Sequence, residues 1–134
     1  MSLAVWQHSS DGLPHHPVWL TVVDWSFGPQ APPQLTELAA QRMAETRPTV
    51  LHGDFLACDA FDQSEHISEI SKPTLVITGA EDKMTPVRNA QFLAGAIPNA
   101  QLEIVPNAGH MVMLEQPQTV ANALLSFLNG VSYN

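Results

Sequence analysis

Residues 73–79 read Pro-Thr-Leu-Val-Ile-Thr-Gly, an unbroken apolar run that closes on a glycine. Such a run is typical of a strand that is buried on both faces of a parallel sheet. After a polar loop, Thr85-Pro86 offers an N-cap and a proline at the first helical position, so we expect a helix there. Residues 102–105, Leu-Glu-Ile-Val, predict a second strand. The pattern over 118–128 predicts a last helix whose inward side chains are Val120, Ala121, Leu124, Phe127 and Leu128. This order predicts an α/β fold, in which a small parallel sheet is joined by a right-handed crossover and flanked by helices.

Polar residues follow both predicted strands. Asp82 lies in the loop after the first strand, and His110 ends the loop Asn107-Ala-Gly-His after the second. Ligands of such sheets bind beyond the carboxyl ends of the strands, and neighbouring strands lie about 4.8 Å apart. We therefore expect a hydrogen bond between the Asp82 carboxylate and the His110 imidazole. That pair is the orienting half of a nucleophilic triad.

The part of the chain before residue 72 is harder to interpret. Six of the 11 prolines lie before residue 50, which excludes long helices or central strands before residue 34. The β-branched and aromatic run Val18–Val23 predicts a short buried strand, which would be the third strand of the sheet. Apolar spacing predicts one helix from residue 34 to Arg47 and a second over 49–60.

Composition narrows the class of protein. The chain has 134 residues, of which 45% are hydrophobic, so we expect one domain with a real core. The formal net charge of −8 argues against nucleic-acid partners, because binding to a phosphate backbone depends on clustered Lys and Arg. No apolar run reaches the roughly 18 residues of a membrane-spanning helix, so we expect no membrane partner. The first residues, Met-Ser-Leu-Ala, lack the features of a secretory signal, which favours a cytoplasmic location.

In combination and order, these motifs resemble the C-terminal part of the α/β-hydrolase fold. The resemblance rests on the Pro-Thr-Leu-Val-Ile strand, the Gly-x-x-Asp-x-x-Thr-Pro that follows it, Ala-Gly-His, and Glu-Gln-Pro before the last helix. It is closest to the esterase, enol-lactonase and haloperoxidase-like branch. The resemblance implies three segments: 1–33 as a proline-rich lead-in with a possible strand, 34–71 as a cap-like helical segment, and 72–134 as part of the hydrolase core.

The resemblance also implies a chemistry. Asp82 would be the triad acid and His110 the general base of a serine-type hydrolase acting on an ester, a lactone or a similar carbonyl compound, with no cofactor and no metal. The family's nucleophile lies in Gly-x-Ser-x-Gly, and this sequence contains no such motif. We therefore expect a partial α/β-hydrolase fold that lacks the nucleophile half and has little or no activity as an isolated chain.

Other readings of these residues stay open. Asp82 could be a turn carboxylate and His110 an ordinary loop histidine, and Glu81 is a rival for the acid. His52 and Asp54 could contact a substrate or simply lie at the surface. The chain as a whole could be a non-catalytic remnant of the fold that binds itself or a partner, because a small parallel sheet leaves an unpaired edge. From that edge we expect a homodimer or a higher oligomer.

Cys58 is the single cysteine, which excludes an intramolecular disulfide. Because nothing basic flanks it, we expect a small, buried apolar side chain rather than a reactive thiol.

Overall fold

The computed structural model describes residues 18–131; residues 1–17, which hold most of the expected lead-in, and 132–134 lie outside the described part. The described helices and strands lie in the order α1 (Val18–Ser26), α2 (Pro33–Glu45), α3 (Pro48–Ala60), a 3-10 turn (Ile67–Glu69), β1 (Leu75–Gly79), α4 (Val87–Ala96), β2 (Gln101–Val105), α5 (Val112–Glu115) and α6 (Pro117–Gly130).

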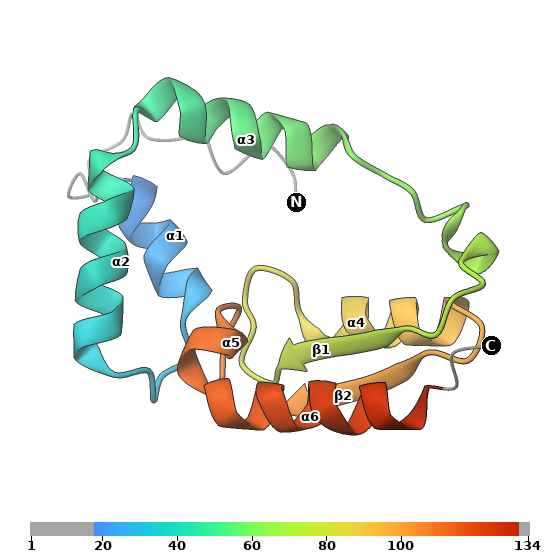
Figure 1. Cartoon of the computed structure of the whole chain (residues 1–134). Helices are drawn as coiled ribbons and strands as arrows, with labels where there is room; N and C mark the ends of the chain where they lie inside the picture. Colours follow the sequence, from blue (N-terminus) through green and yellow to red (C-terminus); the bar gives the residue numbers. More distant parts are fainter. Residues whose placement is uncertain (1–17, 132–134) are drawn as a thin grey trace.

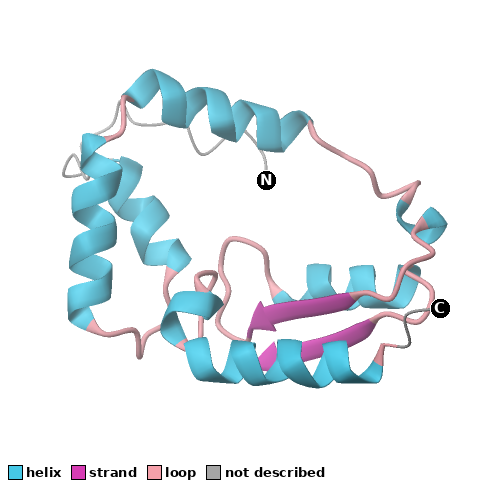
Figure 2. Ribbon diagram, viewed as in Figure 1, coloured by secondary structure: helices cyan, strands magenta, loops and turns pink. Residues whose placement is uncertain are grey.

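The sheet consists of β1 and β2, which run parallel (Figures 1 and 2). Leu75 pairs with Gln101 at one end of the register, and Gly79 pairs with Val105 at the other. Both predicted strands are confirmed, as is the α/β class with a small parallel sheet. The register brings the carboxyl ends of β1 and β2 side by side, so the two loops that carry Asp82 and His110 begin at the same edge.

The two strands lie between α4 and α6. In Figure 1, α4 lies behind the sheet and α6 in front of it. The tightest packing lies at the carboxyl end of β2, where Val105 is 1% exposed and contacts Ala108 and Val112. Ile77 of β1 and Val120 of α6 pack against this cluster. The core is therefore concentrated directly beneath the two loops.

The predicted strand over Val18–Val23 is wrong, because this segment begins the helix α1. A short apolar run fits a buried helix as well as a strand. A strand also requires a neighbour for its backbone hydrogen bonds, whereas a helix satisfies them internally. α1 packs against α2, and its buried side chains are Val22, Val23 and Ser26. The sheet of the described residues therefore has two strands and no third.

The helices α2 and α3 confirm the predicted elements but not the predicted burial. Each begins with a proline and ends within two residues of its predicted end. Neither contains a buried residue, and in Figure 1 α3 lies apart from the sheet. Cys58 lies on α3 and is exposed, so the expectation of a buried cysteine is wrong. The apolar spacing along α3 predicted which face of the helix is apolar, but it could not show whether another element covers that face.

The same distinction between forming a helix and burying it applies to α6, which spans Pro117–Gly130 and so begins and ends within two residues of the predicted 118–128. Val120 and Phe127 are half-buried as expected. Three residues that the periodicity placed inward are instead exposed: Ala121, Leu124 and Leu128. They face away from the small sheet because it has no further surface to cover them.

The turn after α3 is stabilised by Asp62. Its Oδ1 accepts a hydrogen bond from the backbone amide of Ser64 at 2.8 Å. Hydrogen bonds from the Ser64 side chain and amide hold the pKa of the Asp62 carboxyl below its usual value.

Candidate active site

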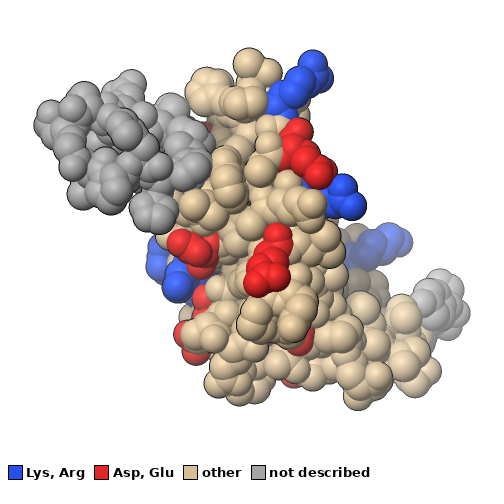
Figure 3. All heavy atoms as spheres, turned by 90° about the vertical axis from the view of Figure 1, so that its left-hand side faces the viewer, with Lys and Arg blue, Asp and Glu red and all other residues tan. Residues whose placement is uncertain are grey.

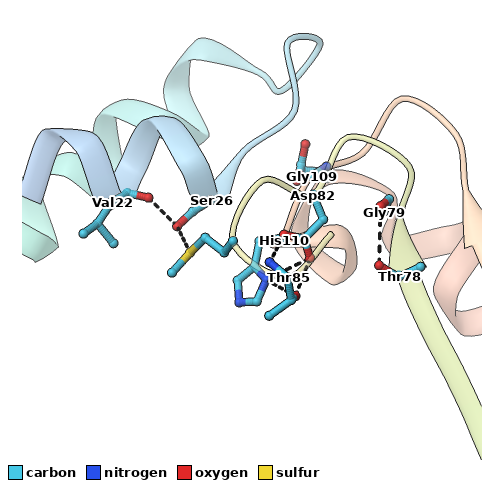
Figure 4. A network of polar contacts seen from close by, with 10 residues as sticks. Val22, Ser26, Thr78, Gly79, Asp82, Thr85, Gly109 and His110 are labelled. Atoms are coloured by element: carbon cyan, nitrogen blue, oxygen red, sulfur yellow. Dashed lines mark hydrogen bonds and ion pairs between the residues drawn. The ribbon is translucent and has the colours of Figure 1, made fainter. Parts of the chain in front are cut away.

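Asp82 and His110 meet where the two strands end. Asp82 follows β1, and His110 follows β2 through a turn in which Asn107 has a φ of 57°. Asparagine tolerates this left-handed conformation better than most residues. Oδ2 of Asp82 lies 3.0 Å from Nδ1 of His110, so the expected hydrogen bond is confirmed (Figure 4). The Asp82 side chain is 4% exposed and that of His110 is 36% exposed, so a buried acid holds a base that solvent reaches.

Thr85 completes the environment of the carboxylate. Its backbone amide donates to Oδ1 of Asp82 at 2.8 Å, and its hydroxyl donates to Oδ2 at 2.8 Å. The hydroxyl oxygen also lies 3.1 Å from Nδ1 of His110. The two oxygens of Asp82 thus accept three hydrogen bonds, two from Thr85 and one from the His110 ring. The Asp82 carboxylate therefore holds the turn at Thr85 and contacts His110 at the same time, so the two interpretations of this residue do not exclude each other.

Sequence reasoning assigned Thr85 a different task. It predicted a helix N-cap, but Pro86 occupies that position and Thr85 binds Asp82 instead. The Gly-x-x-Asp-x-x-Thr spacing could have indicated this contact, since in a tight turn a hydroxyl three residues after a carboxylate can donate a hydrogen bond to it.

The other candidates lie elsewhere. Glu81 is exposed, and its backbone amide donates to the carbonyl of Ala108, which joins the two loops at 2.9 Å. His52 and Asp54 lie on α3, which Figure 1 shows away from the ends of the strands. Of the sequence candidates, the structure therefore brings together Asp82 and His110.

Ser26 is a buried hydroxyl near this site. Its Oγ lies 2.7 Å from the carbonyl oxygen of Val22 and 3.3 Å from Sδ of Met84 (Figure 4). A serine that donates to the carbonyl four residues earlier in its own helix has its proton engaged there. Among residues 18–131, Ser26 therefore makes no hydrogen bond to an imidazole of the kind that activates a nucleophilic serine.

The arrangement supports acid–base chemistry. With Nδ1–H donating to a carboxylate, the neutral imidazole carries its lone pair on Nε2. When Nε2 accepts a proton, the buried Asp82 stabilises the imidazolium. Among residues 18–131, no group of three or more His, Cys, Asp or Glu could hold a metal ion.

Other surfaces of the described residues are less informative. A cavity of about 200 Å³ lies at the opposite ends of the strands, where Pro73, Pro98 and Gln101 line it, and no titratable residue does. On the face in Figure 3, Lys and Arg side chains lie among Asp and Glu without forming a continuous basic patch. None of the helices within 18–131 has the length and apolar character needed to span a bilayer.

Comparison with protein families gives one match over most of the chain. A family model described as the alpha/beta hydrolase fold matches residues 16–117. The matched range contains α1 to α5, both strands, and the loops that carry Asp82 and His110.

Individual relatives agree with that match. The 2-hydroxy-6-oxo-6-(2'-aminophenyl)hexa-2,4-dienoic acid hydrolase of Metapseudomonas resinovorans is 41% identical over 69 residues, which is 52% of this chain and 24% of that protein. A monoacylglycerol lipase of Mus musculus is 37% identical over 67 residues, which is 50% of this chain and 20% of that protein. The structure of a thermophilic esterase is 36% identical with a TM-score of 0.74, and the match covers 84% of this chain and 46% of the esterase. The chain thus spans a quarter or less of these two curated relatives.

Proposed function

The chain belongs to the α/β-hydrolase fold family, and from that membership we propose that it carries the acid and the base of a serine-type hydrolytic site. In this proposal Asp82 orients the imidazole and His110 is the general base. The observation that supports it is the 3.0 Å contact between Oδ2 of Asp82 and Nδ1 of His110, with the carboxylate buried and held by Thr85.

The proposed reaction divides an acyl transfer into two steps. A serine oxygen attacks the carbonyl carbon of the substrate while its proton passes to Nε2 of His110. The protonated His110 then donates that proton to the leaving-group oxygen as the bond to the acyl carbon breaks. In the second step a water molecule gives a proton to Nε2 as its oxygen attacks the acyl carbon, and the imidazolium returns that proton to the serine oxygen as the acyl–serine bond breaks.

The nucleophile and the oxyanion-binding amides would come from the part of the hydrolase core that precedes β1 in the family. No Gly-x-Ser-x-Gly occurs in the 134 residues, and the thermophilic esterase is more than twice as long as the portion that this chain matches. Oxyanion donors alone contribute about 10²–10³ in rate. We therefore propose that the isolated chain has little or no turnover.

The proposed substrates are esters, lactones or similar small carbonyl compounds. The relatives named as an esterase, a monoacylglycerol lipase and a dienoic acid hydrolase support this class. This breadth of substrates fits the proposed mechanism. A general base oriented by a buried carboxylate can serve any acyl transfer in which an oxygen or carbon leaving group accepts the proton.

A chimera tests the proposal. Residues 18–131 would replace the matching part of the thermophilic esterase, whose remaining chain supplies the nucleophile. We expect hydrolysis of short p-nitrophenyl esters, and we expect His110→Ala and Asp82→Asn each to lower kcat by about 10⁴-fold. His66→Ala is the control, because His66 is exposed and pairs with Glu69 outside the site. A chimera in which His110→Ala keeps its activity would contradict the role of His110.

The isolated chain provides a second test. Fluorophosphonate probes, which label activated serines, should leave it unlabelled. Stoichiometric labelling would show that one of its own serines is activated.

A second candidate function is that of a non-catalytic, self-associating form of the fold. It is favoured by large apolar side chains of α6 that stay exposed and are neighbours at helical spacing, namely Leu124, Leu125 and Leu128. Monomeric proteins seldom expose such a contiguous patch, and a second copy of the chain would cover it. In this reading the Asp82–His110 pair is retained without a nucleophile.

A further inference from the structure

Glu115 occupies a position that the acid–base pair does not explain. It is half-buried at the end of α5, and each of its carboxylate oxygens accepts a backbone hydrogen bond. Oε2 accepts from the amide of Gly28 at 2.9 Å, and Oε1 accepts from the amide of Gly109 at 2.9 Å. Within residues 18–131 no Lys, Arg or His forms an ion pair with it. Its two partners are the amide of Gly28, just after α1, and the amide of Gly109, the residue before His110.

These two segments touch through their backbones. A Cβ added at Gly109 would overlap backbone atoms of Phe27 and Gly28. The amide of Met111 also donates to the carbonyl of Ser26 at 2.9 Å. The His110–Met111 peptide is therefore fixed directly to Ser26, and the Ala108–Gly109 peptide is fixed to Gly28 through Glu115.

Three hydrogen bonds join main-chain groups of residues 108–111 to Glu81, Glu115 and Ser26. The carbonyl of Ala108 accepts from the Glu81 amide, the amide of Gly109 donates to Glu115, and the amide of Met111 donates to Ser26. The first and third join backbone to backbone. Glu115 is the only side chain among these three, so it is the attachment that a substitution can remove while the backbone stays unchanged.

We propose that Glu115 is a positioning residue, whose carboxylate sets the direction of the His110 imidazole by binding the amides of Gly109 and Gly28 together. This inference rests on the proposed function, because it assigns Glu115 a task in presenting the general base. A carboxylate suits the task since both of its oxygens are acceptors. A glutamine in the same place would offer one acceptor and turn an N–H₂ group toward the other amide.

The proposal also connects α1 with the base. Residues 26–28 leave α1, so a shift of that helix would reach His110 through the Glu115 carboxylate and the Ser26 carbonyl. In that case the Glu115 side chain would couple the position of α1 to the orientation of the His110 imidazole.

The test uses NMR spectroscopy of the whole chain. In the unsubstituted chain we expect through-hydrogen-bond scalar couplings from the amide nitrogens of Gly28 and Gly109 to the side-chain carboxylate carbon of Glu115. We also expect a downfield proton signal from Nδ1–H of His110, assigned by its loss in His110→Ala. Absence of both couplings would overturn the proposal, and this measurement does not depend on any variant folding.

Glu115→Gln then separates positioning from folding. We expect the amide of Gly28 or Gly109 to exchange about 10- to 100-fold faster with solvent, as for loss of a charge-assisted hydrogen bond. We expect the Nδ1–H signal of His110 to shift or broaden, while the far-UV circular dichroism stays unchanged. Glu103→Gln, the same change at a half-buried glutamate of β2, should leave all three measurements as they were.

Each other result counts against the proposal. If the amides exchange faster but the His110 signal is unchanged, Glu115 joins the segments without positioning the base. If Glu115→Gln unfolds the chain, the residue is needed for the fold and is not a positioning residue in the sense proposed. Both measurements are independent of turnover, so the positioning role can fail while His110→Ala still abolishes activity in the chimera, and the reverse can also occur.

Discussion

The segment from β1 to α6 and the pair α2–α3 contrast in how they are held. The first contains Val105, Ala108 and Val112 as a buried cluster, and its loops are joined by hydrogen bonds between distant residues. The second contains no buried residue, and its helices end with local turns. Both show clear helix signals in the sequence. The difference teaches that these signals decide whether a helix forms, whereas a covering surface decides whether it contributes to the core.

The sharpest way to test this contrast is one substitution made in both regions. Gly109→Ala should destabilise the fold by about 3 kcal/mol, because its Cβ would overlap the backbone of Phe27 and Gly28 in a rigid junction. Gly53→Ala on α3 meets nothing within 4 Å and should stabilise the chain by about 0.5–1 kcal/mol through helix propensity. Urea unfolding measures both free energies. If both substitutions changed the free energy of unfolding equally and in the same direction, the two regions would not differ in how tightly they are packed.

A pair of valines tests the packing itself. Val105→Ala removes two buried methyl groups from a residue that is 1% exposed, and should cost about 2 kcal/mol. Val50→Ala on α3 alters a residue that is 40% exposed and should change the free energy of unfolding by less than about 0.5 kcal/mol. Thermal and urea unfolding would report the two values. If Val50→Ala cost as much as Val105→Ala, α3 would have to be covered in solution.

Self-association tests whether the open surface of α6 is covered by a second copy. We expect a homodimer or higher oligomer at micromolar concentration. Leu125, which is 59% exposed, should contribute to the contact, so Leu125→Asp should weaken association at least tenfold, or about 1.4 kcal/mol. Sedimentation equilibrium measures the constant. Phe61→Asp, at an exposed residue after α3, is the control and should have no effect. A chain that stays monomeric would contradict this prediction.

The smallest effect concerns Thr85. Thr85→Val keeps the shape and the backbone amide but removes the hydroxyl that donates to Oδ2 of Asp82, so we expect a loss of about 1 kcal/mol. The Nδ1–H signal of His110 should also shift, because that nitrogen lies 3.1 Å from the lost oxygen. Thr85→Ser retains the hydroxyl and should restore both properties. Equal behaviour of the valine and serine variants would show that the hydroxyl has no role in orienting the pair.

Most of the elements around the site were predictable from the sequence. The run Pro73–Thr78 predicted β1, and the loops after the two strands predicted that Asp82 and His110 would meet. These inferences succeeded because a parallel pair of strands has few possible registers and both loops must leave at the same edge. The segment Val18–Val23 failed as a strand because its apolar run fits either structure, and the sheet offers it no partner.

The role of Glu115 shows what periodicity cannot supply. Its two amide partners, Gly28 and Gly109, are 87 and 6 residues away in sequence, and no spacing rule joins them. Thr85 shows the same limit at short range, since a residue suited to a helix N-cap serves a carboxylate three residues before it.

By itself the sequence determined the α/β class, the two strands, most helix bounds and the contact between Asp82 and His110, because each depends on local patterns or on the geometry of neighbouring parallel strands. Tertiary structure alone decided that Val18–Ser26 is a helix, that Cys58 and Leu128 are exposed, and that Glu115 joins residues far apart in the chain. Those outcomes depend on which surfaces meet. Burial and long-range hydrogen bonds are properties of two partners, and a pattern along one segment describes only one of them.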